Sequence, residues 1–236
     1  MDQTYMKKQN ILKLLLTMAL PMVISMLVNS LYNIVDSFFV AKISENAMTA
    51  ISLVFPMQNF INSVMIGFGI GINAVIAFYM GASDKETADK AASQGLFLST
   101  VHGIVLMAGC IILIRPFLNM FTNDQTVIDL GMKYSVIAFA FSLMLAWELV
   151  FEKTFQAVGR MTVSMTAMLT GCITNIILDP VLIFGLGIFP RMEIEGAALA
   201  TGIGQTVSLI VYIIIYISRP IPVRFTRKYM KPEKVL

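Results

Sequence analysis

The sequence predicts an all-α integral membrane protein built as a bundle of six transmembrane helices. Hydrophobic residues make up 57% of the chain and charged residues only 13%, and the mean hydropathy is +0.79. The apolar residues occur in long uncharged runs that lack the strict alternation of a membrane β-barrel, so a barrel is excluded. Because lipid satisfies no backbone polar group, helices are then the structure that can cross the bilayer.

A helix needs about 20 apolar residues to cross the bilayer, and six segments between charged residues meet this length. The first, at about 14–41, contains one charged residue, Asp36. The second is longer than the bilayer is thick, so it must tilt, kink or extend past the surface, with Pro56 and the Gly67 to Gly71 run as the favoured places. The predicted helices span residues 14–41, 47–80, 91–114, 126–150, 161–184 and 196–218, and together they form one transmembrane domain over residues 1–218.

Residues 219–236 form a basic tail after the last predicted helix. The run Arg219-Pro220-Ile221-Pro222 stops the helix, because proline lacks the backbone donor that a helix needs. Two roles remain open for this tail. It could anchor the end of the domain to anionic membrane lipid, or it could be a cytoplasmic linker to further protein.

Lysine and arginine are distributed unevenly between the two sides of the predicted bundle. By the positive-inside rule the richer side faces the cytoplasm. We therefore expect a multi-pass protein of the cell (inner) membrane with its N- and C-termini in the cytoplasm. The cytoplasmic set is Lys7, Lys8, Lys13, Lys85, Lys90, Lys153, Arg160, Arg219, Arg224, Arg227, Lys228, Lys231 and Lys234, and the opposite set is Lys42, Arg115, Lys133 and Arg191.

Two aspartates, Asp36 and Asp179, lie within predicted helices. A carboxylate at the centre of a membrane helix costs on the order of 2.5–3.5 kcal/mol to insert, so it is retained mainly for function. Tyr32 lies one helical turn before Asp36, and Asn175 lies one turn before Asp179. Pro180 frees a backbone carbonyl one turn earlier as a further oxygen ligand. The alternative is structural, with Asp36 bonding a neighbouring helix and Asp179 ending its own.

Counting residues from the outer ends of the helices places these polar groups at one level. Asp36 lies six residues before Lys42, and Thr201 lies six residues after Glu195, so each is about 9 Å inside the outer surface at a rise of about 1.5 Å per residue. Asp179 has a similar depth if its helix ends near Gly185. Two carboxylates, an amide, a phenol and a hydroxyl at one level would suit a hard monovalent cation or a shared proton.

Other polar and soft side chains are weaker candidates for a substrate cleft. Asn33 and Gln58 are polar residues within predicted helices. Met57 belongs to a methionine-rich set that would suit a cavity for varied apolar ligands, or would simply form core. His102, the one histidine in the sequence, could be a proton relay, a cleft residue or a hydrogen-bonded packing residue.

Enzyme chemistry finds no support in the sequence. There is no nucleophile motif near a base, no histidine-rich metal spacing and no phosphate-binding loop. Glu148 and Glu152 are interpreted as interfacial residues paired with Lys153 or Arg160. We therefore expect no enzymatic activity, no cofactor and no nucleic-acid partner, and we expect membrane lipid as the surroundings.

Several segments, in order and with matching helix spacing, resemble the N-terminal lobe of a multidrug and toxic-compound extrusion (MATE) family transporter. The resemblance covers essentially the whole chain. The segments are Ala19-Leu20-Pro21, Tyr32-Asn33-Ile34-Val35-Asp36, Gln156-Ala157-Val158-Gly159-Arg160, the run from Asn175 to Gly185 that includes Asp179 and Pro180, and the run from Glu195 through Thr201 to Gln205.

This resemblance implies a function. Such transporters have twelve helices in two six-helix lobes around a cleft, and they export cationic or amphipathic small molecules in exchange for sodium ions or protons. It implies that Asp36, Asp179, Asn175, Tyr32 and Thr201 form the cation site, with sodium at Asp36 and Asp179 if sodium is the coupling ion. Six helices equal one lobe, so the resemblance implies a partner lobe, either a missing C-terminal half or another subunit. A flippase for a lipid-linked or amphipathic substrate and a non-transporting membrane scaffold are the alternatives.

Overall fold

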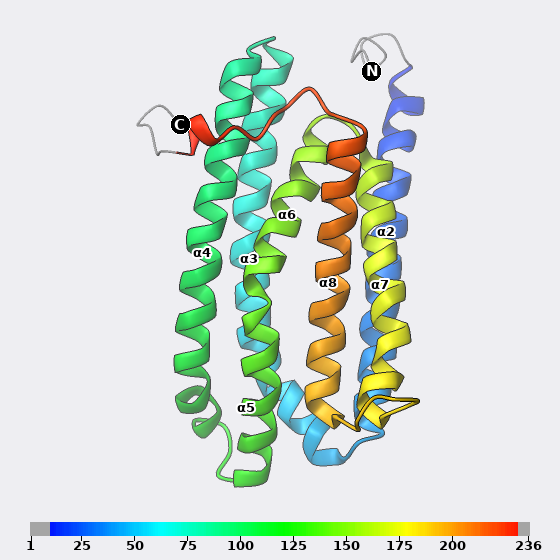
Figure 1. The fold of residues 1–236 in the computed structure, drawn as a ribbon, viewed down its shortest axis with the longest axis vertical. Coiled ribbons are helices and arrows are strands. Elements are labelled where there is room, and N and C mark those ends of the chain that lie inside the picture. Colours follow the sequence, from blue (N-terminus) through cyan, green and yellow to red (C-terminus); the bar gives the residue numbers. More distant parts are fainter. Residues whose placement is uncertain (1–9, 231–236) are drawn as a thin grey trace.

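The computed structural model describes residues 10–230, and these residues form helices and no strand (Figure 1). The predicted all-α bundle is therefore confirmed. Lys7, Lys8, Lys231 and Lys234, which the charge count assigns to the cytoplasm, lie outside the described residues. The helices are α2 (Ile11–Ala41), α3 (Glu45–Gly81), α4 (Lys85–Asn119), α5 (Gln125–Ala140), α6 (Ser142–Ala157), α7 (Met161–Phe184) and α8 (Glu193–Ser218), followed by the 3-10 helix η1 (Arg227–Tyr229).

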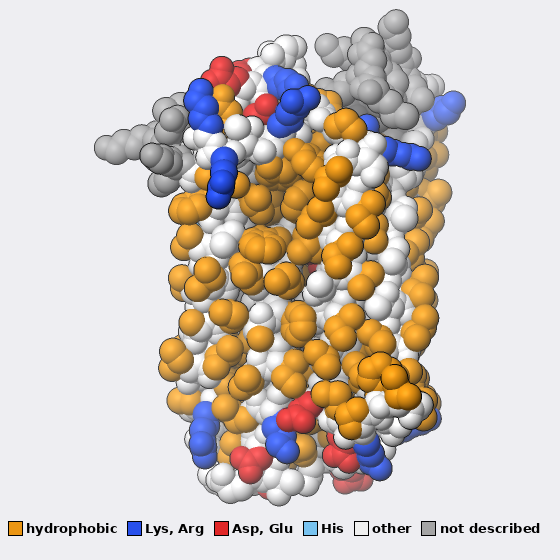
Figure 2. All heavy atoms as spheres, in the orientation of Figure 1, with side chains coloured by type: hydrophobic (Ala, Val, Ile, Leu, Met, Phe, Trp, Pro, Cys, Tyr) orange, Lys and Arg blue, Asp and Glu red, His pale blue; other side chains and the backbone are white. Residues whose placement is uncertain are grey.

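The helices of residues 10–230 have the length and hydropathy of membrane spans. Five are long and apolar enough to cross a bilayer by themselves, and the number rises to six if the bent pair α5 and α6 forms one span. Figure 2 shows apolar side chains over the middle of the bundle and charged side chains gathered at its two ends. α2 begins and α8 ends at the same end of the bundle. This distribution is that of a multi-pass membrane protein.

The fourth predicted helix, at 126–150, is wrong as a single straight element. The chain instead forms α5 and α6, which meet at Phe141 with a bend of 42°. The ring of Phe141 lies against Gly202 of α8, where an added Cβ would come within 2.2 Å of the ring. No proline or glycine marks the bend in the sequence, so a contact between distant segments accounts for it.

The third predicted helix, at 91–114, is too short at both ends, because α4 runs from Lys85 to Asn119. Asp84 caps its first turn by accepting hydrogen bonds from the hydroxyl of Thr87 at 2.7 Å and from its backbone N–H at 3.0 Å. These bonds hold the pKa of the Asp84 carboxyl below its ordinary value. The stabilisation is therefore present above the ordinary pKa and is lost as pH falls through the lowered one.

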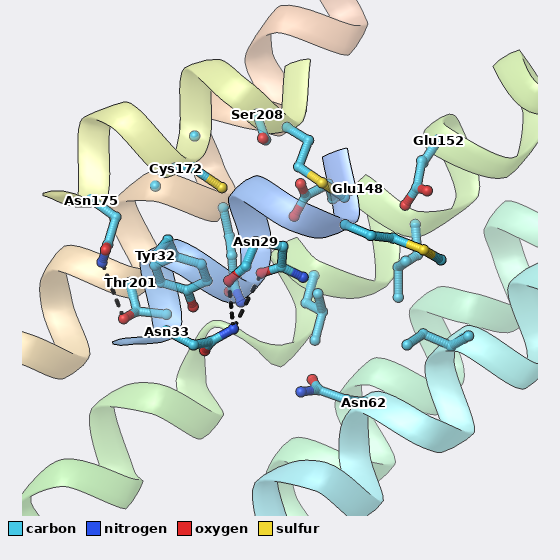
Figure 3. A pocket seen from close by; sticks show the side chains of 18 of the residues that line it. Asn29, Tyr32, Asn33, Asn62, Glu148, Glu152, Cys172, Asn175, Thr201 and Ser208 are labelled. Atoms are coloured by element: carbon cyan, nitrogen blue, oxygen red, sulfur yellow. Dashed lines mark hydrogen bonds between the residues drawn. The ribbon is translucent and has the colours of Figure 1, made fainter. Parts of the chain in front are cut away.

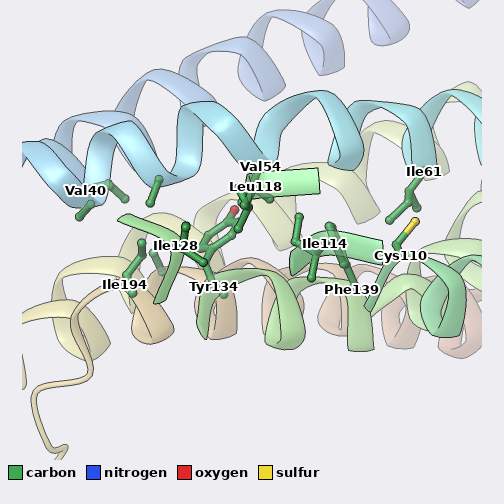
Figure 4. Packing of buried hydrophobic residues seen from close by; sticks show 14 of the residues in the cluster. Val40, Val54, Ile61, Cys110, Ile114, Leu118, Ile128, Tyr134, Phe139 and Ile194 are labelled. Carbon is green, nitrogen blue, oxygen red and sulfur yellow. The ribbon is translucent and has the colours of Figure 1, made fainter. Parts of the chain in front are cut away.

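One apolar cluster fills the end of the bundle where α3, α4, α5 and α8 meet (Figure 4). Val54, Leu118 and Ile128 are fully buried within it. A second cluster lies near the opposite end and joins α3, α4, α6, α7 and α8, with Phe155 and Tyr212 stacked at 5.8 Å between ring centroids. The two clusters fix α6 and α8 relative to α3 and α4, and so they position the polar groups between these helices.

After α8 the chain crosses the end of the bundle to reach α4, in a segment that we call the strap (residues 219–230). Its backbone N–H groups are bonded to the bundle, with Arg224 donating to Asp89 Oδ1 at 2.7 Å and Thr226 donating to Ser93 Oγ at 2.9 Å. Ile221 and Val223 are buried. The strap is thus held by specific contacts to α4 as well as by its covalent link to α8.

Replacing Asp89 with alanine is expected to loosen the strap. The change removes the charged acceptor of the Arg224 N–H, and a hydrogen bond to a charged group contributes about 1.5–3 kcal/mol. Hydrogen–deuterium exchange at residues 221–226 should accelerate by about tenfold or more, while exchange within α8 should not change. The exposed Asp129→Ala is the matched control, and equal exchange in both variants would contradict a bond that holds the strap.

Candidate cation site and pocket

A pocket of about 360 Å³ lies between α2, α3, α6, α7 and α8 (Figure 3). Asn175 and Thr201 line it towards one end, and Glu152 and Lys153 line it towards the other. Between them the wall is mainly apolar, with side chains that include Met26, Ile66, Leu145, Leu149 and Met168. Mostly apolar walls with a few polar groups are typical of a site for a small organic ligand.

The polar end of the pocket is organised around Asn175, which is 2% exposed. Its side-chain N–H group donates to Asp179 Oδ1 at 3.3 Å and to Thr201 Oγ1 at 3.3 Å. Asn175 and Asp179 are one turn apart on α7, so the helix places both side chains on one face. The amide therefore joins the α7 carboxylate to the α8 hydroxyl.

The α7 and α8 backbones approach closely beside this group. A Cβ added to Gly171 would lie 2.5 Å from Ser208 Oγ and 2.8 Å from Gly204 O, and a Cβ added to Gly204 would lie 2.9 Å from Gly171 O. Small residues allow this approach in membrane bundles. The hydrogen bond between Asn175 and Thr201 depends on this approach, because their side chains are short.

Asp36 of α2 faces the same group. It is close enough to Asp179, Tyr32 and Tyr134 for direct electrostatic interaction. Tyr134 of α5 is 3% exposed, and its hydroxyl donates to Gln58 Oε1 of α3 at 3.5 Å. Side chains from α2, α5, α7 and α8 therefore lie near the two carboxylates, and Gln58 of α3 accepts a hydrogen bond from Tyr134 beside them.

Three buried oxygens of this group have no hydrogen-bond partner among the described residues: Asp36 Oδ1, Asn175 Oδ1 and Asp179 Oδ2. Each is an acceptor, so none can satisfy another. Leaving a buried acceptor unpaired costs about 1–3 kcal/mol. A hard monovalent cation or a proton is the kind of species that such oxygens accommodate. Within the described residues no cluster of three or more His, Cys, Asp or Glu side chains could hold a metal ion.

The other sequence-predicted cleft residues are placed in different surroundings. Asn33 lines the pocket, and its amide donates to Asn29 O at 2.8 Å. Gln58 lies beside Tyr134 rather than in the pocket wall. Met57 packs against the apolar cluster of α3, α4, α5 and α8. His102 contacts the Phe68 ring at 4.8 Å between centroids and bonds Leu98 O at 2.9 Å, and neither His102 nor Phe68 lines the pocket.

The sequence predicts interfacial positions for the two carboxylates of α6, but in the structure both line the pocket. Glu152 does pair with Lys153, at 3.0 Å, and is 8% exposed. Glu148 forms no ion pair with Lys153, nor with Arg160, whose guanidinium donates to Arg219 O at 3.0 Å. The signal available in the sequence was the spacing of Glu148 and Glu152, four residues apart, which puts both on the same face of a helix.

A family model described as MatE matches residues 21–181. The chain belongs to the MatE family. This match confirms the resemblance found from the sequence segments, and it covers α2 through most of α7, including Asp36, Asn175 and Asp179. The MatE assignment also agrees with the expected transporter architecture of membrane-spanning helices.

Known proteins similar to this MatE chain are transporters. A protein named FAD transporter from Shewanella oneidensis is 30% identical over 84% of this chain and 44% of its own length. The multidrug export protein MepA of Staphylococcus haemolyticus is 27% identical over 98% of this chain and 51% of its own length. A crystal structure of MATE in the bent conformation superposes with a TM-score of 0.89 at 27% identity, over 99% of this chain and 52% of that one. The chain thus spans about half the length of the relatives it matches.

Proposed function

We propose that this MatE chain is the N-terminal half of an antiporter that exports cationic or amphipathic small molecules in exchange for sodium ions or protons. Support comes from relatives named as a multidrug export protein and an FAD transporter. The flippase alternative is not favoured by these relatives.

The observation that carries the proposal is the set of three buried, unpaired acceptor oxygens on Asp36, Asn175 and Asp179. In this proposal Asp36 and Asp179 supply the negative charge that attracts the coupling ion. Asn175 and Thr201 hold Asp179 in place through their hydrogen bonds. Tyr32 lies one turn from Asp36 and also lines the pocket, so it connects the ion site with the space for substrate.

The same site suits either coupling ion. A sodium ion would be bound by carboxylate, amide and hydroxyl oxygens, which are the ligands that hard cations prefer. A proton would instead be held by one of two neighbouring carboxylates, because two like charges at short range cannot both persist in a site of low dielectric constant. In both versions the bound cation interacts with the buried oxygens and so offsets the free-energy cost of leaving them unpaired. Release of the cation restores that free-energy cost.

A second six-helix lobe is the proposed partner of this half. α2 leaves large apolar side chains exposed, including Leu20 at 59%, Leu27 at 62% and Ile34 at 65%. Membrane lipid or a second lobe would cover them. Alternating access needs two lobes that move relative to one another. We further propose that the end of the bundle with the strap faces the cytoplasm, since Lys85, Lys90 and Arg160 lie there.

Thermal unfolding of the purified chain, across a sodium titration and a pH series, tests this proposal. A bound ion stabilises the folded state by RT ln(1 + [L]/Kd), which is about 2.7 kcal/mol at 100 times Kd. We expect wild type to be stabilised by sodium or to respond to pH, and Asp36→Asn and Asp179→Asn to lose that response.

Asp129→Asn is the matched control, because Asp129 is exposed near the start of α5. It should respond as wild type does. Stabilisation by sodium would identify sodium as the ion, and a pH response alone, lost in both variants, would identify the proton. Equal responses of wild type, Asp36→Asn and Asp179→Asn would overturn the proposed site.

A further inference from the structure

The strap brings basic side chains together at the start of α4, outside the pocket described above. Tyr229 of η1 lies at the centre of this group. Lys90 Nζ of α4 lies 5.4 Å from the centroid of the Tyr229 ring, and Lys228 Nζ lies 5.5 Å from it. Two ammonium groups near one ring repel each other, so an anion that contacted both would be attracted to this place.

The acidic side chains around this ring do not cancel the basic ones. Asp89 is engaged with the backbone of the strap, where it accepts the Arg224 N–H at 2.7 Å. Glu86 lies 3.2 Å from Lys90 and accepts a hydrogen bond from the Tyr229 hydroxyl at 3.4 Å, but its side chain is 66% exposed, and an exposed ion pair is weak. The group has five basic and three acidic side chains, which leaves a net charge of +2: Lys85, Lys90, Arg224, Arg227 and Lys228 against Asp84, Glu86 and Asp89.

An outward-facing apolar surface of α4 begins directly after this basic group. Phe97 and Val101 follow Lys90 at seven and eleven residues, so the helical period puts all three on one face. Phe97 is 38% exposed and Val101 43%, and Ile104 and Val105 continue the surface at 47% and 61%. Figure 2 likewise shows basic side chains at this end of the bundle and apolar side chains over its middle. Basic side chains at the edge of an exposed apolar surface have the position of lipid headgroups.

A groove of about 310 Å³ lies between α3 and α4, next to the same basic group. Gln94, one helical turn after Lys90, lines it on α4, and the exposed Gly67 and Gly71 line it on α3. A Cβ added to either glycine would meet no atom within 4 Å, so the groove is open at these positions. Its other walls are mainly apolar and include Leu98. Within a bilayer such a groove would hold an acyl chain by van der Waals packing.

We propose that Lys90, Lys228 and Tyr229 form a site for an anionic phospholipid. The phosphate lies against the two ammonium groups, and one acyl chain lies in the groove between α3 and α4. The cytoplasmic leaflet is rich in anionic lipid, in agreement with the cytoplasmic side proposed for the strap. Bound lipid would contact both the strap and α4, and so it would hold the strap in place. This inference goes beyond the export function and depends neither on the ion site nor on the exported compound.

Native mass spectrometry of the purified chain in neutral detergent tests the proposal with three probes. They are phosphatidylglycerol, phosphatidylcholine with the same acyl chains, and sn-glycerol 3-phosphate, which has a phosphate but no acyl chain. We expect phosphatidylglycerol to bind most tightly. The double variant Lys90→Gln with Lys228→Gln should weaken phosphatidylglycerol binding by about tenfold or more and change phosphatidylcholine binding by less than about twofold, because only the attraction to the net negative charge of the lipid is lost.

Lys42→Gln with Lys133→Gln is the matched control, because it removes two exposed lysines that the charge count assigns to the opposite side of the membrane. Lys42 also lies over an aromatic ring, 4.2 Å from the centroid of Phe38. This control should bind phosphatidylglycerol as wild type does. Gly71→Leu fills the groove and should weaken the binding of both lipids. Thermal unfolding of each variant verifies folding.

Three results would overturn the proposed lipid site. The first is equal phosphatidylglycerol binding by wild type and the Lys90 and Lys228 double variant. The second is an equal loss in the Lys42 and Lys133 control, which would indicate attraction to the net charge of the chain alone. The third is binding of sn-glycerol 3-phosphate as tight as that of the lipid, which would make the ligand a free phosphate. Unchanged lipid binding by Gly71→Leu would exclude the groove as the place of the acyl chain.

Discussion

Replacing Lys153 with methionine is expected to lower the free energy of unfolding by about 3–5 kcal/mol, because it removes one partner of a buried ion pair. Glu152 is 8% exposed and lies 3.0 Å from Lys153 Nζ. Without the ammonium group, its carboxylate would keep only the Gln156 amide as a donor. Chemical denaturation of the purified variant in detergent measures the change.

The double variant Glu152→Gln with Lys153→Met shows whether the instability of Lys153→Met comes from the unpaired Glu152 charge or from lost packing of the lysine side chain. It removes both charges and should recover most of the lost stability, since replacing a buried pair by neutral groups of similar size is often neutral. Lys42→Met, at an exposed position on the opposite end of the bundle, should change stability by less than about 0.5 kcal/mol. A Lys153→Met variant as stable as wild type would show that the pair contributes nothing.

Replacing Gly171 with valine is expected to destabilise the fold by about 2–3 kcal/mol, the range of overpacked cores. The first added atom would lie 2.8 Å from Gly204 O, so α7 and α8 would have to separate. Because the Asn175 amide reaches Thr201 across this contact, the separation should also reduce the response of thermal unfolding to sodium or pH.

Gly67→Val provides the matched control for this experiment. An added Cβ at Gly67 meets no atom within 4 Å, so both stability and ion response should stay near those of wild type. If Gly171→Val were as stable as Gly67→Val, the close approach of α7 and α8 would not be needed for the fold. If it were unstable but kept its full ion response, Thr201 would not be needed at the site.

The closeness of Thr201 to Asn175 and Asp179 could be predicted in part, because a helix has a fixed rise per residue. Counting from Lys42 and Glu195 placed Asp36 and Thr201 at equal depth, and the structure bonds Thr201 to Asn175 at 3.3 Å. The helical period likewise predicts that Asn175 and Asp179 share a face. The depth of a residue along a helix, and the face of the helix on which its side chain lies, depend only on its position in that helix. Both can therefore be calculated from a single sequence.

The bend at Phe141 and the surroundings of Glu148 could not be predicted in this way. Phe141 bends the chain where its ring meets Gly202, about 60 residues further on. The sequence predicts that Glu148 and Glu152 pair with Lys153 or Arg160, but it does not indicate which glutamate pairs with which cation. That choice depends on Gln156 and on the Asn73 contact from α3. The contacts of Phe141 with Gly202 and of Asn73 with Lys153 join distant segments, on which local patterns carry no information, whereas Gln156 lies one helical turn from Glu152.

The strap also determines which part of the protein would first resist a pulling force applied after the strap. Bonds to Asp89 and Ser93 clamp residues 224–226 onto α4, and the Phe225 ring packs between Tyr216 and Phe151. A pull applied beyond Met230 would therefore be resisted first at the start of α4, before it stretched the junction with α8. α8, which carries Thr201, is in this sense shielded from tension on the chain that follows it.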